Sequence, residues 1–328
     1  MRLAFDARVR PRSSFARVLA LLEGAARAVE LHFEEWREGP CRSDVLWCLR
    51  QAELPPPEAA GPRWLATVYD VNPLLPDGRP AWQRWRRARR FRRQVAAVLD
   101  RAWRTATVSD DARARIEAHF PAAGARTAVF PLYTEPQFQP DGPPGALAEP
   151  GYVLFLGALR RHKNWAGLLR AYALLPAGLR AAHPLLLAGR AHRAHRPLGR
   201  LVDRLQLGDQ VRVLDEVPEA ELPGLYRGAA VFAFPSLMEG FGLPPLEAMA
   251  CGTPVVSSDR TSLPEVLGAA AALVDPLDAA ALAAALERTL IDPAYADGLR
   301  RAGRERAASF DAARTGRAIR ELLAAPHQ

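Results

Sequence analysis

The chain has 328 residues, of which 49% are hydrophobic and 24% are charged. This balance is typical of a folded globular protein and excludes a disordered or membrane-embedded chain, since no apolar run approaches the ~20 residues of a membrane-spanning helix. At this length about two domains are expected, and the net charge of +8 favours anionic partners, whether phosphorylated small molecules, acidic lipid surfaces or nucleic acid.

The first part of the chain alternates short apolar runs with helical patterns. Its opening residues, MRLAFDARVR, predict a strand with charges inside it and not a secretory signal, so we expect a cytoplasmic protein. Strands are predicted at residues 2–9, 29–33, 44–49 and 64–71, with a helix over 15–28. This alternation is typical of a parallel sheet with crossover helices.

Two further helices precede a break in the pattern. Apolar residues at near-helical spacing predict a long helix after Pro80. Ser109 is a candidate cap for a helix that continues through His119. The following segment 134–150 is rich in proline and glycine, which indicates a linker and a domain boundary.

The pattern then starts again. Strands are predicted at residues 152–159, 184–189, 211–217, 230–236, 253–258 and 270–276, with helices between them and after residue 279. We therefore expect an α/β fold of two doubly wound Rossmann-like lobes: an N-terminal domain over 1–140 and a C-terminal domain over 141–328, whose last helix can cross back to the first. Ligands of such sheets bind beyond the carboxyl ends of the strands, so the site is expected in an interdomain cleft.

The segment from Pro235 to Val256 combines a glycine-rich loop with a helix start. The loop carries Glu239 and two glycines, and Pro244 and Pro245 open the helix. Free N–H groups and close backbone approach suit a diphosphate. Glu239 and Glu247, separated by seven residues, can accept hydrogen bonds from sugar hydroxyls. A structural role fits equally well, because a glutamate in the first turn complements the helix dipole.

The whole segment, with its two glutamates around GFG, resembles the signature of family 4 retaining glycosyltransferases. The resemblance covers nearly the whole chain, most closely residues 152–278. It implies a GT-B fold with the nucleotide on the C-terminal lobe, Glu247 on the ribose and Glu239, a catalytic residue, on the donor sugar. It further implies donor binding by Gly240, Phe241, Gly242 and Leu243.

The chain has one lysine, Lys163, in the segment between the first strand and helix of the C-terminal lobe, where a turn can cradle phosphate. A compact ammonium differs from the planar fork of arginine, although a solvated lysine is the alternative. By the resemblance, Lys163 binds the donor diphosphate in a turn that includes Gly157. Many relatives have an arginine where this chain has Ala158, so Arg160 or Arg161 would substitute, and either choice is open.

The resemblance implies a mechanism with retention. The nucleoside diphosphate departs, helped by Lys163 and an arginine, and the acceptor hydroxyl attacks the same face of the anomeric carbon. No metal or other cofactor is expected, because side-chain cations do this work and no DxD-like carboxylate pair demands a metal. The cysteines Cys41, Cys48 and Cys251 lack CxxC or Cys/His spacing, so neither a disulfide framework nor a zinc site is predicted.

The segment TVYDVNPL, residues 67–74, resembles the family's strand end that contains His-Asp and faces the donor sugar. Asp70 keeps its place there and is a candidate catalytic residue. Tyr69 replaces the histidine and is a poor base near neutral pH, because the pKa of tyrosine is ~10. Around Ser13, arginine, proline and serine stand where relatives have glycines. We assign Arg8, Ser13 and Tyr69 to the acceptor side.

The densest basic stretch is Arg84–Arg93. A solvated helix face accounts for it. The alternative is attachment to an anionic membrane surface, with Trp82, Trp85 and Phe91 at the interface, as suits a lipid-linked acceptor. Nucleic acid is a third interpretation, without an RRM signature or zinc-finger spacing to support it.

We predict a hexosyltransferase that moves a sugar from a nucleotide sugar to a glycan or lipid-linked acceptor, in the cytoplasm or at the inner face of the membrane. The motifs YDVNPL, HKN and LPPLEAMACGTPVV are similar to those of bacterial mannosyltransferases of polysaccharide assembly, which favours mannose from GDP-mannose. Asp215 or Glu216 would accept hydrogen bonds from guanine. The alternatives are a UDP-glucose-like donor, with a small-molecule or polysaccharide acceptor, and a non-catalytic GT-B scaffold or sugar-binding module.

Overall fold

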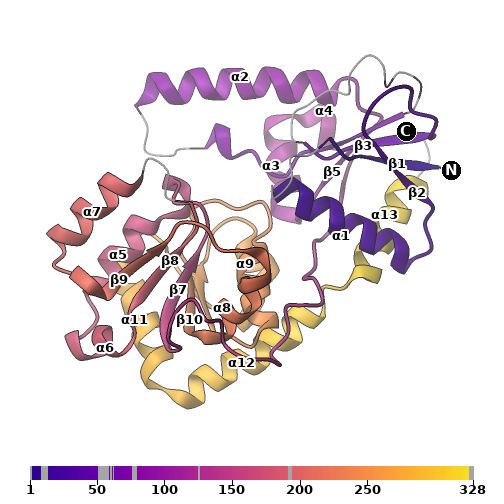
Figure 1. The fold of residues 1–328 in the computed structure, drawn as a ribbon. Coiled ribbons are helices and arrows are strands. Elements are labelled where there is room, and N and C mark those ends of the chain that lie inside the picture. Colours follow the sequence, from indigo (N-terminus) through magenta and orange to yellow (C-terminus); the bar gives the residue numbers. More distant parts are fainter. Residues whose placement is uncertain are drawn as a thin grey trace. The chain divides into compact units, whose positions relative to one another are not determined.

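The computed structural model describes residues 2–8, 14–50, 59, 61, 63–75, 80–124, 126–190 and 194–324. The chain forms two compact units, each built on a six-stranded parallel sheet (Figure 1). Unit 1 comprises Met1–Tyr133 and Phe310–Gln328, and unit 2 comprises Thr134–Ser309. The two units therefore meet in sequence at the start of the proline- and glycine-rich segment 134–150, and the C-terminal residues group with unit 1.

The sheet of unit 1 has the strand order β2-β1-β3-β4-β5-β6. Its strands are β1 (Leu3–Asp6), β2 (Phe33–Trp36), β3 (Val45–Cys48), β4 (Arg63–Thr67), β5 (Arg104–Thr107) and β6 (Thr127–Val129). The ring of Trp47 on β3 lies 5.6 Å from that of Phe5 and 5.2 Å from that of Phe130. All three side chains are fully buried, so an aromatic cluster forms the centre of this core.

The strand predicted over residues 29–33 is wrong in its position, because β2 begins at Phe33. The preceding residues close a helix instead. Leu31 donates its N–H to the carbonyl oxygen of Ala26 at 2.9 Å, and Glu30 takes a left-handed φ of 54°. This is the geometry of a Schellman-type C-cap, which the apolar sequence pattern does not reveal.

The helices of unit 1 include the long helix predicted after Pro80. They are α1 (Ser14–Ala28), α2 (Ala81–Leu99), α3 (Asp110–His119), α4 (Pro121–Gly124) and α13 (Ala312–Ala324), with the 3-10 turn η2 (Asn72–Leu74). Ser109 caps α3 as predicted, since its hydroxyl accepts the N–H of Ala112 at 3.1 Å. The last helix, α13, packs against α1 (Figure 1). None of the helices in the described residues is long and apolar enough to cross a bilayer.

The sheet of unit 2 has the order β12-β11-β10-β7-β8-β9. Its strands lie where the sequence predicts them: β7 (Tyr152–Leu156), β8 (Leu185–Ala188), β9 (Val211–Leu214), β10 (Ala229–Phe234), β11 (Val255–Ser258) and β12 (Ala272–Val274). Successive strands run outward from β7 on one side and from β10 on the other. The switch point, where ligands bind in such sheets, is therefore the carboxyl end of β7 and β10.

Helices cover the sheet of unit 2 (Figure 1). They are α5 (Trp165–Ala173), α6 (Ala177–Ala182), α7 (His195–Arg204), α8 (Leu222–Gly228), α9 (Leu243–Ala250), α10 (Leu263–Leu267), α11 (Ala279–Ile291) and α12 (Pro293–Ala308), with the 3-10 turns η3 (Arg161–Lys163), η5 (Gly208–Gln210), η6 (Glu219–Glu221) and η7 (Gly268–Ala270). Leu168, Leu169 and Tyr172 of α5 point inward and join one core with the side chains of β7 and β8.

Candidate functional site

The residues between β7 and α5 form a tight turn, the Lys163 turn, over residues 157–164. Gly157 has a φ of 151° and donates its N–H to the carbonyl oxygen of Ala188 at 2.8 Å. Asn164, with a left-handed φ of 54°, then leads from the 3-10 turn η3 into α5. Lys163 thus lies just before the helix, at the switch point of the sheet.

Lys163 is paired with the loop glutamate that the sequence assigns to the donor sugar. Its Nζ lies 2.6 Å from Oε1 of Glu239, and the two side chains are only 18% and 13% exposed. Shielding from water makes such a pair stronger than an exposed one. Nζ also lies 5.0 Å from the ring centroid of Phe234, within cation–π range. Carboxylate and aromatic ring therefore fix the position of the ammonium.

The loop between β10 and α9 is hydrogen-bonded to the Lys163 turn. The carbonyl oxygen of His162 accepts the N–H of Leu237 at 2.7 Å and the hydroxyl of Ser236 at 3.1 Å. Ser236 is fully buried. Two loops that are far apart in sequence are thereby held together at the carboxyl edge of the sheet.

The start of α9 requires a glycine. Gly242 has a φ of 101°, and a Cβ there would lie 2.6 Å from Cδ2 of Leu263. The helix begins at Leu243, so its first turn contains both prolines as predicted. Phe241 is buried, whereas Gly240 and Leu243 are half-buried. The four donor-binding positions of the loop are therefore adjacent to the free N–H groups of the helix.

Glu247 lies deeper in α9 than the sequence predicts. It was expected in the first turn, but the helix already begins at Leu243, so Glu247 lies beyond that turn. The residue is fully buried, and its Oε2 accepts a hydrogen bond from the hydroxyl of Tyr226 on α8 at 2.8 Å. A buried carboxylate without such partners would be strongly unfavourable. This position does not fit a role limited to the helix dipole, because dipole effects fall off within the first turn.

The positions of the two arginines considered as partners of Lys163 do not favour one over the other. Arg160 precedes η3 and Arg161 begins it, and both side chains are exposed. Which of them acts with Lys163 stays a prediction.

The two residues considered for guanine recognition follow β9. Oε1 of Glu216 lies 3.3 Å from Nε of Arg190, and Oδ2 of Asp215 lies 3.0 Å from Nε2 of His195. All four side chains are more than half exposed. Exposed pairs of this kind are weak, so a ligand can replace them at little cost.

The acceptor-side residues belong to unit 1. Oδ1 of Asp70 accepts the N–H of Asn72 at 2.9 Å, a local turn that follows β4. The phenolic oxygen of Tyr69 is buried, and burial raises the pKa of Tyr69 above its ordinary value, although a hydrogen bond with Thr67 acts in the opposite direction. Tyr69 therefore stays neutral and is unsuited to act as a base.

Arg8 is bound to the end of β1. Its guanidinium contacts both carboxylate oxygens of the buried Asp6, at 2.8 and 2.7 Å, and lies 4.8 Å from the ring of Trp36. Ser13 lies outside the described residues.

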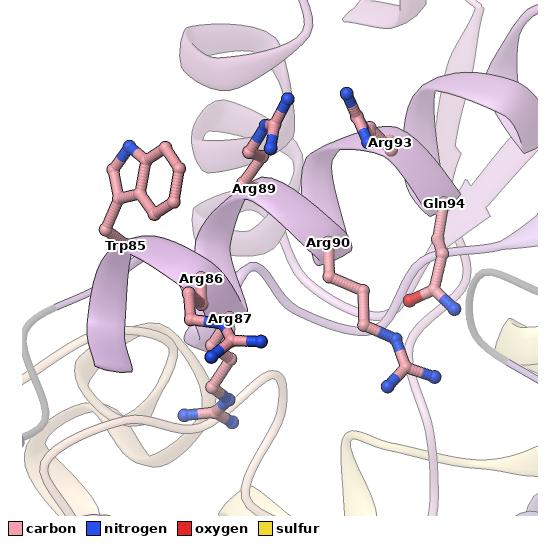
Figure 2. Close-up of a pocket in the computed structure, with 7 residues that line it drawn as sticks. All are labelled: Trp85, Arg86, Arg87, Arg89, Arg90, Arg93 and Gln94. Atoms are coloured by element: carbon pink, nitrogen blue, oxygen red, sulfur yellow. The ribbon is translucent and has the colours of Figure 1, made fainter. Parts of the chain in front are cut away.

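The arginines of the basic stretch lie on more than one side of α2: Figure 2 shows Arg89 and Arg93 on the side of Trp85, and Arg86, Arg87 and Arg90 on the other side. Trp82 and Trp85 are 61% and 62% exposed, and Arg89 and Arg93 continue the same stripe at helical spacing. Figure 2 shows a hollow along this helix, lined by Trp85, Arg86, Arg87, Arg89, Arg90, Arg93 and Gln94. The proposed interfacial position of Phe91 is wrong, because Phe91 is buried in a core cluster with Val68 and Val95.

Four residues of the site were missed by the sequence analysis. Gly189, after β8, has a φ of 126°, and a Cβ there would lie 2.5 Å from the carbonyl oxygen of Gly157. Tyr226 supports Glu247, and Thr261 and Ser262 contact the loop of Glu239. Of the four, only Gly189 leaves a signal in sequence, as a glycine that directly follows a strand.

Within the described part of the chain, no three His, Cys, Asp or Glu side chains come together as metal ligands would. Cys41, Cys48 and Cys251 are buried and are not joined by disulfide bonds. Burial raises the pKa of Cys251 to about 12, so this thiol stays protonated.

Comparison with known proteins gives a family and several relatives. The family model for glycosyl transferases group 1 matches residues 143–306. The O-antigen chain mannosyltransferase B of Escherichia coli is 37% identical over 241 residues, which cover 71% of this chain and 62% of that relative. The chain thus matches less than two thirds of the relative's length.

Solved structures share the fold over nearly the whole chain. A sucrose-phosphate synthase from Thermosynechococcus elongatus aligns over 99% of both chains, with a TM-score of 0.77 and 22% identity. WaaG, a glycosyltransferase involved in lipopolysaccharide biosynthesis, aligns over 99% of this chain and 100% of its own, with a TM-score of 0.78 and 15% identity. Together with the two parallel sheets, these neighbours show the GT-B fold.

Proposed function

Because this chain belongs to the glycosyl transferases group 1 family, we propose that it is a retaining glycosyltransferase of family 4 that moves a hexose from a nucleotide sugar to a glycan or lipid-linked acceptor. The single observation that carries the proposal is the pair formed by Lys163 and Glu239 at the switch point of the unit 2 sheet. A cation for a diphosphate and a carboxylate for sugar hydroxyls lie side by side there, next to the N-terminus of α9.

In this proposal the donor binds unit 2. Its diphosphate lies against the Lys163 turn and the N-terminus of α9, and Glu247 holds the ribose. Lys163, with Arg160 or Arg161, neutralises the charge that develops on the departing nucleoside diphosphate. The acceptor hydroxyl then attacks the same face of the anomeric carbon, and its proton passes to an oxygen of the departing diphosphate. Asp70 of unit 1 is a further catalytic residue, and Tyr69 contributes on the acceptor side.

We propose that the reaction needs no metal ion, because side-chain cations stabilise the leaving group. Full activity in the presence of excess chelator is the expected result. A loss of activity that added Mg²⁺ or Mn²⁺ restores would contradict this part of the proposal.

The preferred donor is GDP-mannose. Support comes from the mannosyltransferase relative and from the carboxylates of Asp215 and Glu216 at the end of β9, which can accept hydrogen bonds from guanine N–H groups. A thermal-shift panel of GDP, UDP and ADP tests this choice, because a ligand bound only by the native state raises the melting temperature. GDP should raise it by several degrees. A shift with UDP and none with GDP would establish a UDP-sugar enzyme instead.

We further propose that α2 contacts an anionic membrane surface on the cytoplasmic side. Two exposed tryptophans and a row of arginines on one helix face are typical of interfacial binding. The protein should co-sediment with anionic vesicles and not with neutral ones, and Arg89→Gln with Arg93→Gln should weaken this binding. Equal sedimentation with both vesicle types, or with neither, would leave the basic stretch as a solvated helix face.

A further inference from the structure

The backbone of Glu239 is held on both sides by the segment that follows β11. The N–H of Glu239 donates to Oγ1 of Thr261 at 3.1 Å, and the hydroxyl of Ser262 donates to the carbonyl oxygen of Glu239 at 3.2 Å. Ser262 also contacts the carbonyl oxygen of Phe241 at 3.0 Å. Two hydroxyl side chains therefore fix the main chain on either side of the Glu239 side chain.

The side chain of Ser262 does not cap the helix that begins after it. It is the N-cap residue of α10, where a serine normally accepts an N–H of its own helix, yet its side chain makes no cap hydrogen bond. Its hydroxyl contacts the Glu239 loop instead, and the residue is fully buried. This bond serves the loop and not the helix.

Thr261 has an unusual backbone conformation. Its φ is 56°, in the left-handed region that β-branched residues rarely enter. In this conformation its Oγ1 accepts from Glu239 and donates to the carbonyl oxygen of Arg260 at 2.8 Å. Backbone strain of this kind persists where surrounding contacts hold it, and it is enriched at functional sites.

We propose that Thr261 and Ser262 are positioning residues that set the carboxylate of Glu239 against the donor sugar. The loop of Glu239 contains glycines at positions 240 and 242, which would otherwise allow many backbone conformations. The two hydroxyls select one of them, and in that conformation the Glu239 carboxylate reaches Lys163 at 2.6 Å. The inference rests on the proposed function, and it adds two residues that act through Glu239 without touching the reacting atoms.

Substitutions at Thr261 separate positioning from stability. Thr261→Val keeps the shape and the strain but removes the hydroxyl, and Thr261→Ser keeps the hydroxyl. Thr261→Gly removes the hydroxyl and relieves the strain. We expect Thr261→Val and Thr261→Gly to lower kcat for donor hydrolysis or transfer by about tenfold, and Thr261→Ser to stay within about twofold of the wild type. The melting temperature of Thr261→Gly should be no lower than that of Thr261→Val.

A double-mutant cycle shows whether Thr261 acts through Glu239. On a Glu239→Gln background, Thr261→Val should lower kcat by less than about twofold, and Ser262→Ala should behave in the same way. The affinity for the free nucleoside diphosphate should change less than kcat does, because that ligand carries no sugar and the ring of Phe234 still contacts the Lys163 ammonium. Thr289→Val is a matched control, since Thr289 is a buried threonine on α11 whose hydroxyl also binds a carbonyl oxygen, that of Ala285.

Two results would overturn the inference. The first is a wild-type kcat in both Thr261→Val and Thr261→Gly. The second is that Thr261→Val lowers kcat by the same factor in the wild type and on the Glu239→Gln background. Either result presupposes an active wild-type enzyme. A wild type that neither hydrolyses nor transfers from any nucleotide sugar would contradict the proposed function itself, so the two failures are distinguishable.

Discussion

Replacing Lys163 with alanine is expected to lower kcat by about 10²- to 10³-fold, which is typical when one preorganised charge-stabilising group is removed from an active site. The chain has one lysine, and its ammonium lies between Glu239 and the ring of Phe234 at the switch point. No other lysine can replace it. Steady-state kinetics with a nucleotide sugar and a suitable acceptor, or donor hydrolysis without acceptor, measure the loss.

Two controls belong with this variant. Arg170→Ala removes a cation from the exposed face of the adjacent helix α5 and should leave kcat within about twofold. Because Lys163→Ala also leaves Glu239 without its ammonium partner, its melting temperature must be measured alongside its activity. A folded Lys163→Ala variant with near-normal turnover would rule out the leaving-group role of Lys163.

Among substitutions that add a single methyl group in unit 2, Gly189→Ala is expected to lower the free energy of unfolding most. A Cβ at this position would lie 2.5 Å from the carbonyl oxygen and 2.7 Å from the carbonyl carbon of Gly157, and the φ of 126° is itself unfavourable for alanine. Backbone atoms cannot yield as a flexible side chain does. We expect the free energy of unfolding to fall by about 2 to 4 kcal/mol and the Lys163 turn to be displaced.

Chemical denaturation and nucleotide binding report the two consequences separately. Gly178→Ala on α6 is the matched control, because a Cβ there would meet nothing within 4 Å. It should leave nucleotide binding unchanged and leave the stability equal to the wild type or slightly higher, because alanine favours a helix over glycine. Wild-type stability and nucleotide affinity in Gly189→Ala would contradict the close backbone approach on which the shape of the Lys163 turn depends.

The parts of the fold that depend on local pattern were predictable. The central strands of unit 2, β7, β8, β10 and β11, are buried and form continuous apolar runs, which made them easy to predict. The edge strands β9 and β12 are less buried but also lie where expected. The prediction of a strand over residues 29–33 was wrong because part of this segment forms the C-cap of α1 around Glu30. These residues include apolar and β-branched types, but their backbone is not extended. The prediction that Phe91 lies at a membrane interface was also wrong, because Phe91 is buried. Its arginine neighbours in sequence do not show which face of the helix is buried.

The residues of the site were also predictable only in part. Lys163, Glu239 and Glu247 could be found from the sequence because their charged side chains suit a diphosphate and sugar hydroxyls, and the structure brings the first two together. Tyr226 and Thr261 have no such signal. They lie 21 and 22 positions from the residues they bind, and the packing of α8 and the turn after β11 decides those contacts.

The central claim is that the Lys163 turn binds the diphosphate of the donor, and the chain's only ε-amine allows a direct test. An amine-reactive acylating reagent modifies Lys163 at a rate that mass spectrometry can follow, with the α-amino group as internal standard. Saturating GDP should slow the modification of Lys163 by about tenfold or more and leave the α-amino group unaffected, because a bound diphosphate covers the ammonium. An unchanged rate of Lys163 modification at a GDP concentration that fully shifts the melting temperature would place the nucleotide elsewhere and contradict the claim.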